Sequence, residues 1–189
     1  MAQISREEAI KKYEKGESFS DMDLTGIDLS YENLKGANFS GADLSDAHLQ
    51  NANLEGANFV NAKMLNVFLF GAKLAEACFD GANITEGNLQ DTNLENASFK
   101  EANLFHAQLF GVHAEKANFN KANLTNGRLK RSAFKAANFE EAILANAHLE
   151  RSDLRQANLK RADLSGAFMK PAQLENANLE GANTKNLIR

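Results

Sequence analysis

The side chains most often used in catalysis or metal binding are sparse in this chain and poorly placed for either role. The four histidines are His48, His106, His113 and His148, and the single cysteine is Cys78. No histidine has the spacing to a cysteine or a carboxylate cluster that a metal site requires. The sequence also lacks a Ser-His-Asp arrangement, a P-loop and a GxGxxG motif. We therefore expect no enzymatic activity, no metal and no cofactor.

Two other groups of residues have the chemistry to bind a partner. One is a set of large apolar side chains in an otherwise polar context, namely Val60, Leu65, Phe68, Phe70, Phe105 and Phe110. The other is a set of cations in the C-terminal part, namely Arg128, Lys130, Arg131, Lys135, Arg151 and Arg155. Residues 1–114 hold 8 Lys or Arg against 17 Asp or Glu, whereas residues 115–189 hold 13 against 8. Which of these side chains lie together depends on the fold.

A five-residue repeat fills the chain and predicts that fold. Every fifth residue from Phe19 to Thr184 is large and apolar, with the exceptions of Ala114 and Thr184. The residue two before it is usually Ala, and the residue just before it is usually Asn or Asp, which gives the motif A-(N/D)-(L/F)-x-x. A period of five matches no α-helix, because the apolar stripe would wander around the helix axis. Strand alternation explains it, with Ala and Leu or Phe facing inward and the last two residues turning the chain.

The spacing of phenylalanine indicates four such repeats in each coil. Every twentieth residue from Phe19 to Phe139 is Phe, while the other columns at this spacing are nearly all Leu. Four straight sides per coil follow, and we number them by their inward residues: side 1 from Phe19, side 2 from Leu24, side 3 from Leu29 and side 4 from Leu34. On side 4, the small Ala114 is followed one coil later by Phe134, as a filled interior requires.

This motif resembles the pentapeptide-repeat family, whose members form right-handed quadrilateral β-helices. The resemblance covers residues 17–186. It implies an all-β solenoid, a right-handed quadrilateral parallel β-helix with four pentapeptides per coil. Some family members bind DNA gyrase by imitating duplex DNA, and others form dimers through their ends.

The two ends of the chain are expected to differ. Residues 1–16 predict a short capping helix, with a capping box between Ser5 and Glu8 and with Ile10 and Tyr13 covering the first coil. The β-helix would span residues 17–186 and leave residues 187–189 as a C-terminal tail. Two interpretations of that end stay open: the tail folds over the last coil, or two copies of the chain meet there as a homodimer.

Membrane insertion and secretion are not expected. No run of residues approaches the roughly 20 apolar residues that a bilayer span needs, and the first sixteen residues lack the apolar stretch of a signal peptide. A single cysteine fits the reducing cytoplasm, which is the predicted location.

The repeat places the two candidate binding groups on the outside of the coil. The apolar group, with Leu65 and Phe105 in one column and Phe70 and Phe110 in another, is predicted to gather on sides 2 and 3. Either it binds a protein partner, or its rings pack against the surface and against each other. The cations gather around sides 3 and 4, either as a solvated face or as a site for nucleic acid or an acidic partner. No aromatic residue is interleaved with them, which disfavours single-stranded nucleic acid.

The predicted function is therefore that of a non-enzymatic protein-interaction scaffold whose partner is unknown. The alternative is a DNA-mimicking protein that binds DNA gyrase or another topoisomerase. Mimicry requires acidic residues along most of the rod, and here the acidic bias reverses after residue 114.

Overall fold

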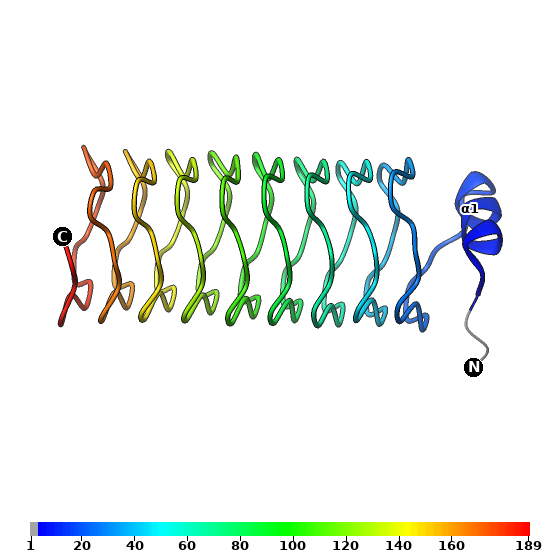
Figure 1. Cartoon of the computed structure of the whole chain (residues 1–189), viewed down its shortest axis with the longest axis horizontal. Coiled ribbons are helices and arrows are strands. Elements are labelled where there is room, and N and C mark those ends of the chain that lie inside the picture. Colours follow the sequence, from blue (N-terminus) through cyan, green and yellow to red (C-terminus); the bar gives the residue numbers. More distant parts are fainter. Residues whose placement is uncertain (1–3) are drawn as a thin grey trace.

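The chain forms one rod of stacked coils in the computed structural model, which describes residues 4–189 (Figure 1). The single helix of these residues, α1, spans Arg6–Glu14 at one end of the rod, and the C-terminus lies at the other end. The coils are joined by isolated parallel β-bridges between residues twenty apart, from Asp23 and Asp43 to Phe168 and Ile188. Four pentapeptides therefore form each coil, and the predicted quadrilateral β-helix is confirmed.

Each side of a coil is too short to form a conventional strand within residues 4–189. The residue before each inward large side chain is the bridge residue, and its neighbours already belong to corners. On side 1, the backbone N–H of Phe59 donates to the carbonyl of Cys78 in the next coil at 2.7 Å, and that of Asn58 donates to Ala37 in the previous coil at 2.9 Å. These bonds satisfy the backbone between coils, as a buried main chain requires.

The corners use the left-handed backbone conformation whether or not glycine is present. The residue two after each inward large side chain has a positive φ, such as 57° at Asp21 and 57° at Ala136. The backbone N–H of Ala62 then closes the corner by donating to the carbonyl of Phe59 at 3.0 Å. Pro171, whose ring fixes φ near −65°, is the exception, and its peptide bond with Lys170 is cis. Glycine is thus frequent at corners because it adopts this conformation without strain.

The interior of the rod is filled by the stacked columns. The seven phenylalanines of side 1 are fully buried, and successive rings lie parallel with centroids 4.6–5.2 Å apart. Phe134 of side 4 leans into this column, edge-on to Phe119 at 5.9 Å and to Phe139 at 5.3 Å. The larger ring thus occupies space next to the small, fully buried Ala114, as the sequence predicted.

Helix α1 covers the first coil, although with a different residue than expected. The capping box is confirmed, because Glu8 N–H donates to the Ser5 hydroxyl and Ser5 N–H donates to the Glu8 carboxylate. Ala9 is fully buried and Tyr13 packs against the core. Ile10 is only half-buried and does not join the core, so the prediction for Ile10 was wrong. The i, i+4 spacing puts Ala9 and Tyr13 on the same helix face and turns Ile10 away.

The C-terminal end of the rod remains open. Ile188 continues the ladder, with its N–H donating to the carbonyl of Ala167 at 2.9 Å, so the segment expected to be a tail runs along the coil instead of folding across it. Leu174 and Leu179 of the last coil are only half-buried, whereas the equivalent Leu154 and Leu159 are fully buried.

Candidate functional site: side 3 of the rod

Most outward asparagines of the repeat have a structural role. On side 1, the Oδ1 atom of Asn58 accepts from the backbone N–H of Val60 at 3.0 Å, while its Nδ2 atom donates to Asn38 in the previous coil at 3.1 Å. On side 2, Asn103 donates in the same way to Asn83 at 3.2 Å. Such an amide ladder shapes each corner and links the coils, so these positions are not free to serve another function.

On side 3, Asn and Asp are replaced at the bridge positions more often than on the other sides. Its bridge positions hold, in order, Asp28, His48, Phe68, Asn88, Gln108, Arg128, His148, Phe168 and Ile188. Only two of these nine residues are Asn or Asp, compared with seven of nine on side 2. The β-bridges are retained throughout, so the backbone does not require the substitutions. Residues on side 3 thus replace a stabilising motif although the fold does not require the replacement. We therefore take side 3 as the candidate binding surface.

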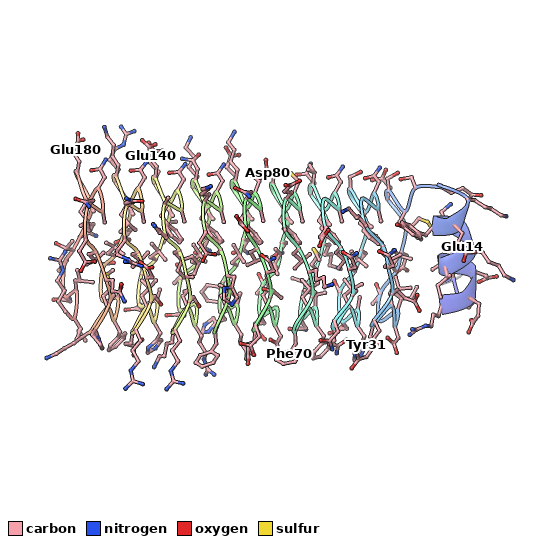
Figure 2. All side chains as sticks on the ribbon, turned by 90° about the horizontal axis from the view of Figure 1, so that it is seen from above. Glu14, Tyr31, Phe70, Asp80, Glu140 and Glu180 are labelled. Carbon is pink, nitrogen blue, oxygen red and sulfur yellow. The ribbon has the colours of Figure 1, made fainter. Side chains whose placement is uncertain are left out.

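The exposed part of the apolar group lies on side 3. Phe68 is 36% exposed and Phe70 is 41% exposed, and both belong to the same pentapeptide. The Phe68 ring stacks on His48 of the previous coil with centroids 4.7 Å apart. Figure 2 shows Phe70 and Tyr31, which is 75% exposed, along one edge of the rod, with Asp80, Glu140 and Glu180 along the opposite edge.

The remaining members of the apolar group are less available. Leu65 and Phe105 lie on side 2 and are half-buried, and the Phe105 ring meets His106 edge-on at 4.3 Å. Val60 is half-buried and lies on side 1, opposite to side 3. The prediction that Val60 gathers with the other apolar residues on sides 2 and 3 was therefore wrong. Phe110 is also half-buried, but it lies on side 3 in the same column as Phe70. The aromatic patch is therefore defined by its position on side 3, as Phe68, Phe70 and Phe110.

The six cations are divided between two sides. Arg128 and Lys130 lie on side 3, and Arg131 and Arg151 lie at the corner that follows it. Lys135 and Arg155 lie on side 4 and line a different hollow there, and Arg155 is paired with Asp153 at 2.6 Å. The basic patch is therefore defined as the side 3 residues Arg128, Lys130, Arg131, Arg151 and Lys170.

The aromatic and basic patches meet at Phe110. The guanidinium carbon of Arg131 lies over the Phe110 ring, 5.7 Å from its centroid. Phe110 also lines an open hollow of about 490 Å³, together with Gln90, Gln108, Arg128, Lys130 and His148. The expectation that no aromatic residue is interleaved with the cations was therefore wrong. The coil brings Phe110 next to residues that follow it by about twenty positions in the chain.

One carboxylate belongs to the basic patch and is held by it. Glu150 receives a hydrogen bond from Lys130 at 2.8 Å and lies 3.4 Å from His148 Nδ1. Burial opposes ionisation of Glu150, yet the hydrogen bonds from Lys130, from its own backbone and from His148 hold its pKa below its usual range. Arg128, Arg131 and Arg151 are exposed and form no ion pair within residues 4–189. These three guanidinium groups are available to a partner.

Sequence reasoning missed several residues of this surface. Tyr31, His48, Gln90, Gln108, His148 and Lys170 all lie on side 3 or at its corner. For His48, Gln108 and His148 the signal was present in the sequence, because they occupy the bridge column of side 3 in which Asn and Asp are replaced. Tyr31, Gln90 and Lys170 lie one or two residues after inward positions of the same side, and they are found only once that column has drawn attention to side 3.

Metal sites and membrane-spanning helices were sought in the part of the chain that the structure describes. Within residues 4–189, no three His, Cys, Asp or Glu side chains are arranged to hold a metal ion. In the same range, no helix has the length and apolar character that a bilayer crossing needs.

Comparisons with known proteins agree with the fold. The model of pentapeptide repeats matches eight copies over residues 18–56, 37–75, 77–113, 102–140 and 132–170. No curated protein matches the sequence.

Two of the solved structures that are similar to this chain illustrate the likeness. A trypsin-treated form of QnrB1, a plasmid-mediated fluoroquinolone resistance protein, is 17% identical with a TM-score of 0.60, and the match covers 88% of this chain and 89% of that one. HetL, a pentapeptide-repeat protein involved in heterocyst differentiation regulation in the cyanobacterium Nostoc sp. strain PCC 7120, is 24% identical with a TM-score of 0.37 and coverage of 100% and 95%. The repeat motif, the twenty-residue ladder and the family match lead to one conclusion: the chain belongs to the pentapeptide-repeat family and folds as its right-handed quadrilateral β-helix.

Proposed function

We propose that this protein is a non-enzymatic interaction scaffold that binds a protein partner through the aromatic patch of side 3. The observation that carries the proposal is the exposure of Phe68 and Phe70 on side 3, where most of the bridge positions no longer hold the Asn or Asp of the amide ladder. Exposed aromatic residues that gather on one face are typical of protein interfaces. The interior offers no competing site, because the stacked columns fill it. The lone half-buried thiol of Cys78 fits action in a reducing compartment such as the cytoplasm.

The open C-terminal coil supports a second contact, between two copies of the chain. Leu174 and Leu179 are half-buried at this end, and their backbone N–H groups have no acceptor within residues 4–189 because no further coil follows. An exposed sheet edge of this kind pairs readily with another edge. We propose a homodimer through this end, which leaves side 3 of both copies free.

DNA mimicry of the kind that targets DNA gyrase remains the alternative function, and the charge distribution weighs against it. The carboxylates do not continue along the rod, because residues 115–189 carry more cations than carboxylates. The likeness to QnrB1 at 17% identity concerns the fold.

Replacing Phe70 and Phe110 by serine tests the scaffold proposal. Serine already occupies equivalent outward positions at Ser30 and Ser40, so the variant is expected to fold. An affinity capture with the intact chain should retain a partner that the Phe70→Ser/Phe110→Ser variant loses, with a decrease of at least about tenfold in affinity, or about 1.4 kcal/mol.

Ile143→Ser is the matched control, because Ile143 is an exposed apolar residue on side 2, 42% accessible, and outside the patch. Capture that is unchanged in the patch variant, or equally lost in the control, contradicts the proposal. Light scattering of the same proteins reports the dimer, whose mass should be twice 20.7 kDa in all three. A monomer mass for the intact chain rules out the end-to-end contact.

A further inference from the structure

We infer that the partner of side 3 is an acidic protein segment with aromatic or other apolar residues next to its carboxylates. This inference rests on the proposed function and specifies the chemistry of the partner. It follows from the joining of the aromatic patch and the basic patch into one surface at Phe110, which neither patch shows by itself.

The basic end of the surface has more positive charge than the protein itself neutralises. From Gln108 onward, the outward positions of side 3 and its corner hold five cations and a single carboxylate, Glu150. That carboxylate is already engaged by Lys130 at 2.8 Å. The chain as a whole has a net charge of −4, so this excess is local. Carboxylates of a partner would complete the pairing of the free guanidinium groups.

The apolar end lies within reach of the same short segment. Phe70 and Phe110 occupy one column two coils apart, which is about 10 Å along the rod. Arg131 and Arg151 follow Phe110 at the next two coils. From Phe70 to Arg151 the surface is about 19 Å long, which an extended peptide of roughly six residues spans. A single segment can therefore place an apolar side chain on the aromatic patch and carboxylates on the basic patch.

The extent of the positive charge favours a protein segment over single-stranded nucleic acid. A nucleic-acid strand places a phosphate at every nucleotide and needs cations along its whole path. Here the cations begin at Arg128, and toward the N-terminus the corners beside side 3 present Asp91 and Glu86 instead. The surface between them and the capping helix combines aromatic and amide-bearing residues with two further carboxylates, Asp28 and Asp46. An acidic segment with apolar residues matches this division, whereas a uniform polyanion does not.

Selection from a displayed library of random short peptides tests the inference while the natural partner is unidentified. The full-length protein serves as bait at low salt, and selected peptides are then measured against three variants. Sequences rich in Asp or Glu together with Phe, Tyr, Trp or Leu should be enriched. Arg131→Glu/Arg151→Glu should weaken their binding by about tenfold or more, and added salt should weaken binding to the intact chain. Glu occupies the same corner conformation at Glu101 and Glu141, so this variant is expected to fold.

Controls separate the two proposals. Lys100→Glu reverses an exposed charge on side 1, opposite to side 3, and should leave binding unchanged. If Phe70→Ser abolishes binding while Arg131→Glu/Arg151→Glu has no effect, the acidic partner is refuted and the proposed function stands. If neither variant has an effect, or no peptide is enriched, both are refuted. Tighter binding of a single-stranded oligothymidine than of any selected peptide identifies a nucleic-acid surface and overturns the inference, and selected peptides without net negative charge do so as well.

Discussion

Replacing Phe79 by alanine is expected to lower the free energy of unfolding by about 3–5 kcal/mol. Phe79 is fully buried, and its ring is stacked between Phe59 at 4.7 Å and Phe99 at 4.6 Å. Removal of the ring leaves a cavity in the middle of a continuous column. The neighbouring coils are fixed by backbone bonds on both sides and cannot collapse into the cavity. Urea denaturation followed by circular dichroism measures the change.

The matched control is Phe70→Ala, which removes the same side chain from the outside of the coil. Because Phe70 is 41% exposed, this substitution should cost less than about 1 kcal/mol. Equal losses of unfolding free energy for the two substitutions would mean that Phe79 is no more buried than Phe70. That result would contradict the inward position of the Phe79 column.

Substitutions at Ala114 and Phe134 are expected to have coupled effects on the free energy of unfolding. Leucine occupies most positions of the side 4 column, so Ala114→Leu and Phe134→Leu each move one position toward the repeat. Ala114→Leu alone should cost about 1–3 kcal/mol, because Phe134 already fills the space next to it. Phe134→Leu alone leaves a cavity beside Phe119 and Phe139. The double variant should lose less than Ala114→Leu alone, which corresponds to a coupling free energy of about 2 kcal/mol.

Additive effects would contradict the compensation. If the double variant lost the sum of the two single losses in the same urea experiment, the two positions would not share a cavity. A suitable comparison is Leu54→Ala combined with Ala114→Leu. Leu54 is fully buried in the same column but lies three coils from Ala114, so the cavity that it leaves cannot relieve the overpacking at position 114, and the two losses should add.

The interior of the rod could be predicted from the sequence almost completely. The inward columns depend only on the number of residues per coil, and the phenylalanines of side 1 reveal that number because they are the same residue type in each coil. Burial and backbone bonding then follow from strand alternation. The compensation between Ala114 and Phe134 was also predictable, because a close-packed interior conserves volume between neighbours.

The outside was less predictable, because side chains there are not fixed by packing. The column of Phe110 is evident from the sequence, but the contact with Arg131 depends on the side-chain conformations of both residues. Val60 was grouped with the aromatic residues by residue type, although its position in the coil assigns it to side 1. The prediction that Ile10 covers the first coil was wrong for a related reason. The face of a short helix that packs on the rod depends on how the helix docks and not on hydrophobicity alone.

The candidate surface on side 3 could have been recognised in the sequence from the residues that are missing there. Asparagine at the bridge positions has a structural reason, as the ladder of Asn38 and Asn58 shows, so its replacement is informative. Sequence analysis that looks only for apolar or charged residues finds Phe70 and Arg131 but not Gln108 or His148. The latter two matter because they complete the hollow in which the two patches meet.

Cysteine cross-linking to the native Cys78 tests the four-sided coil most directly. Asn58 forms a β-bridge with Cys78, and parallel neighbours lie about 4.8 Å apart, within the range that a disulfide bond can join. Lys63 is nearer to Cys78 in the sequence but lies on side 2, and it would face Cys78 only in a three-sided coil. After mild oxidation, peptide mass spectrometry should find an intramolecular disulfide in Asn58→Cys and none in Lys63→Cys. A disulfide in Lys63→Cys and none in Asn58→Cys would contradict the four-sided coil and, with it, the assembly of side 3.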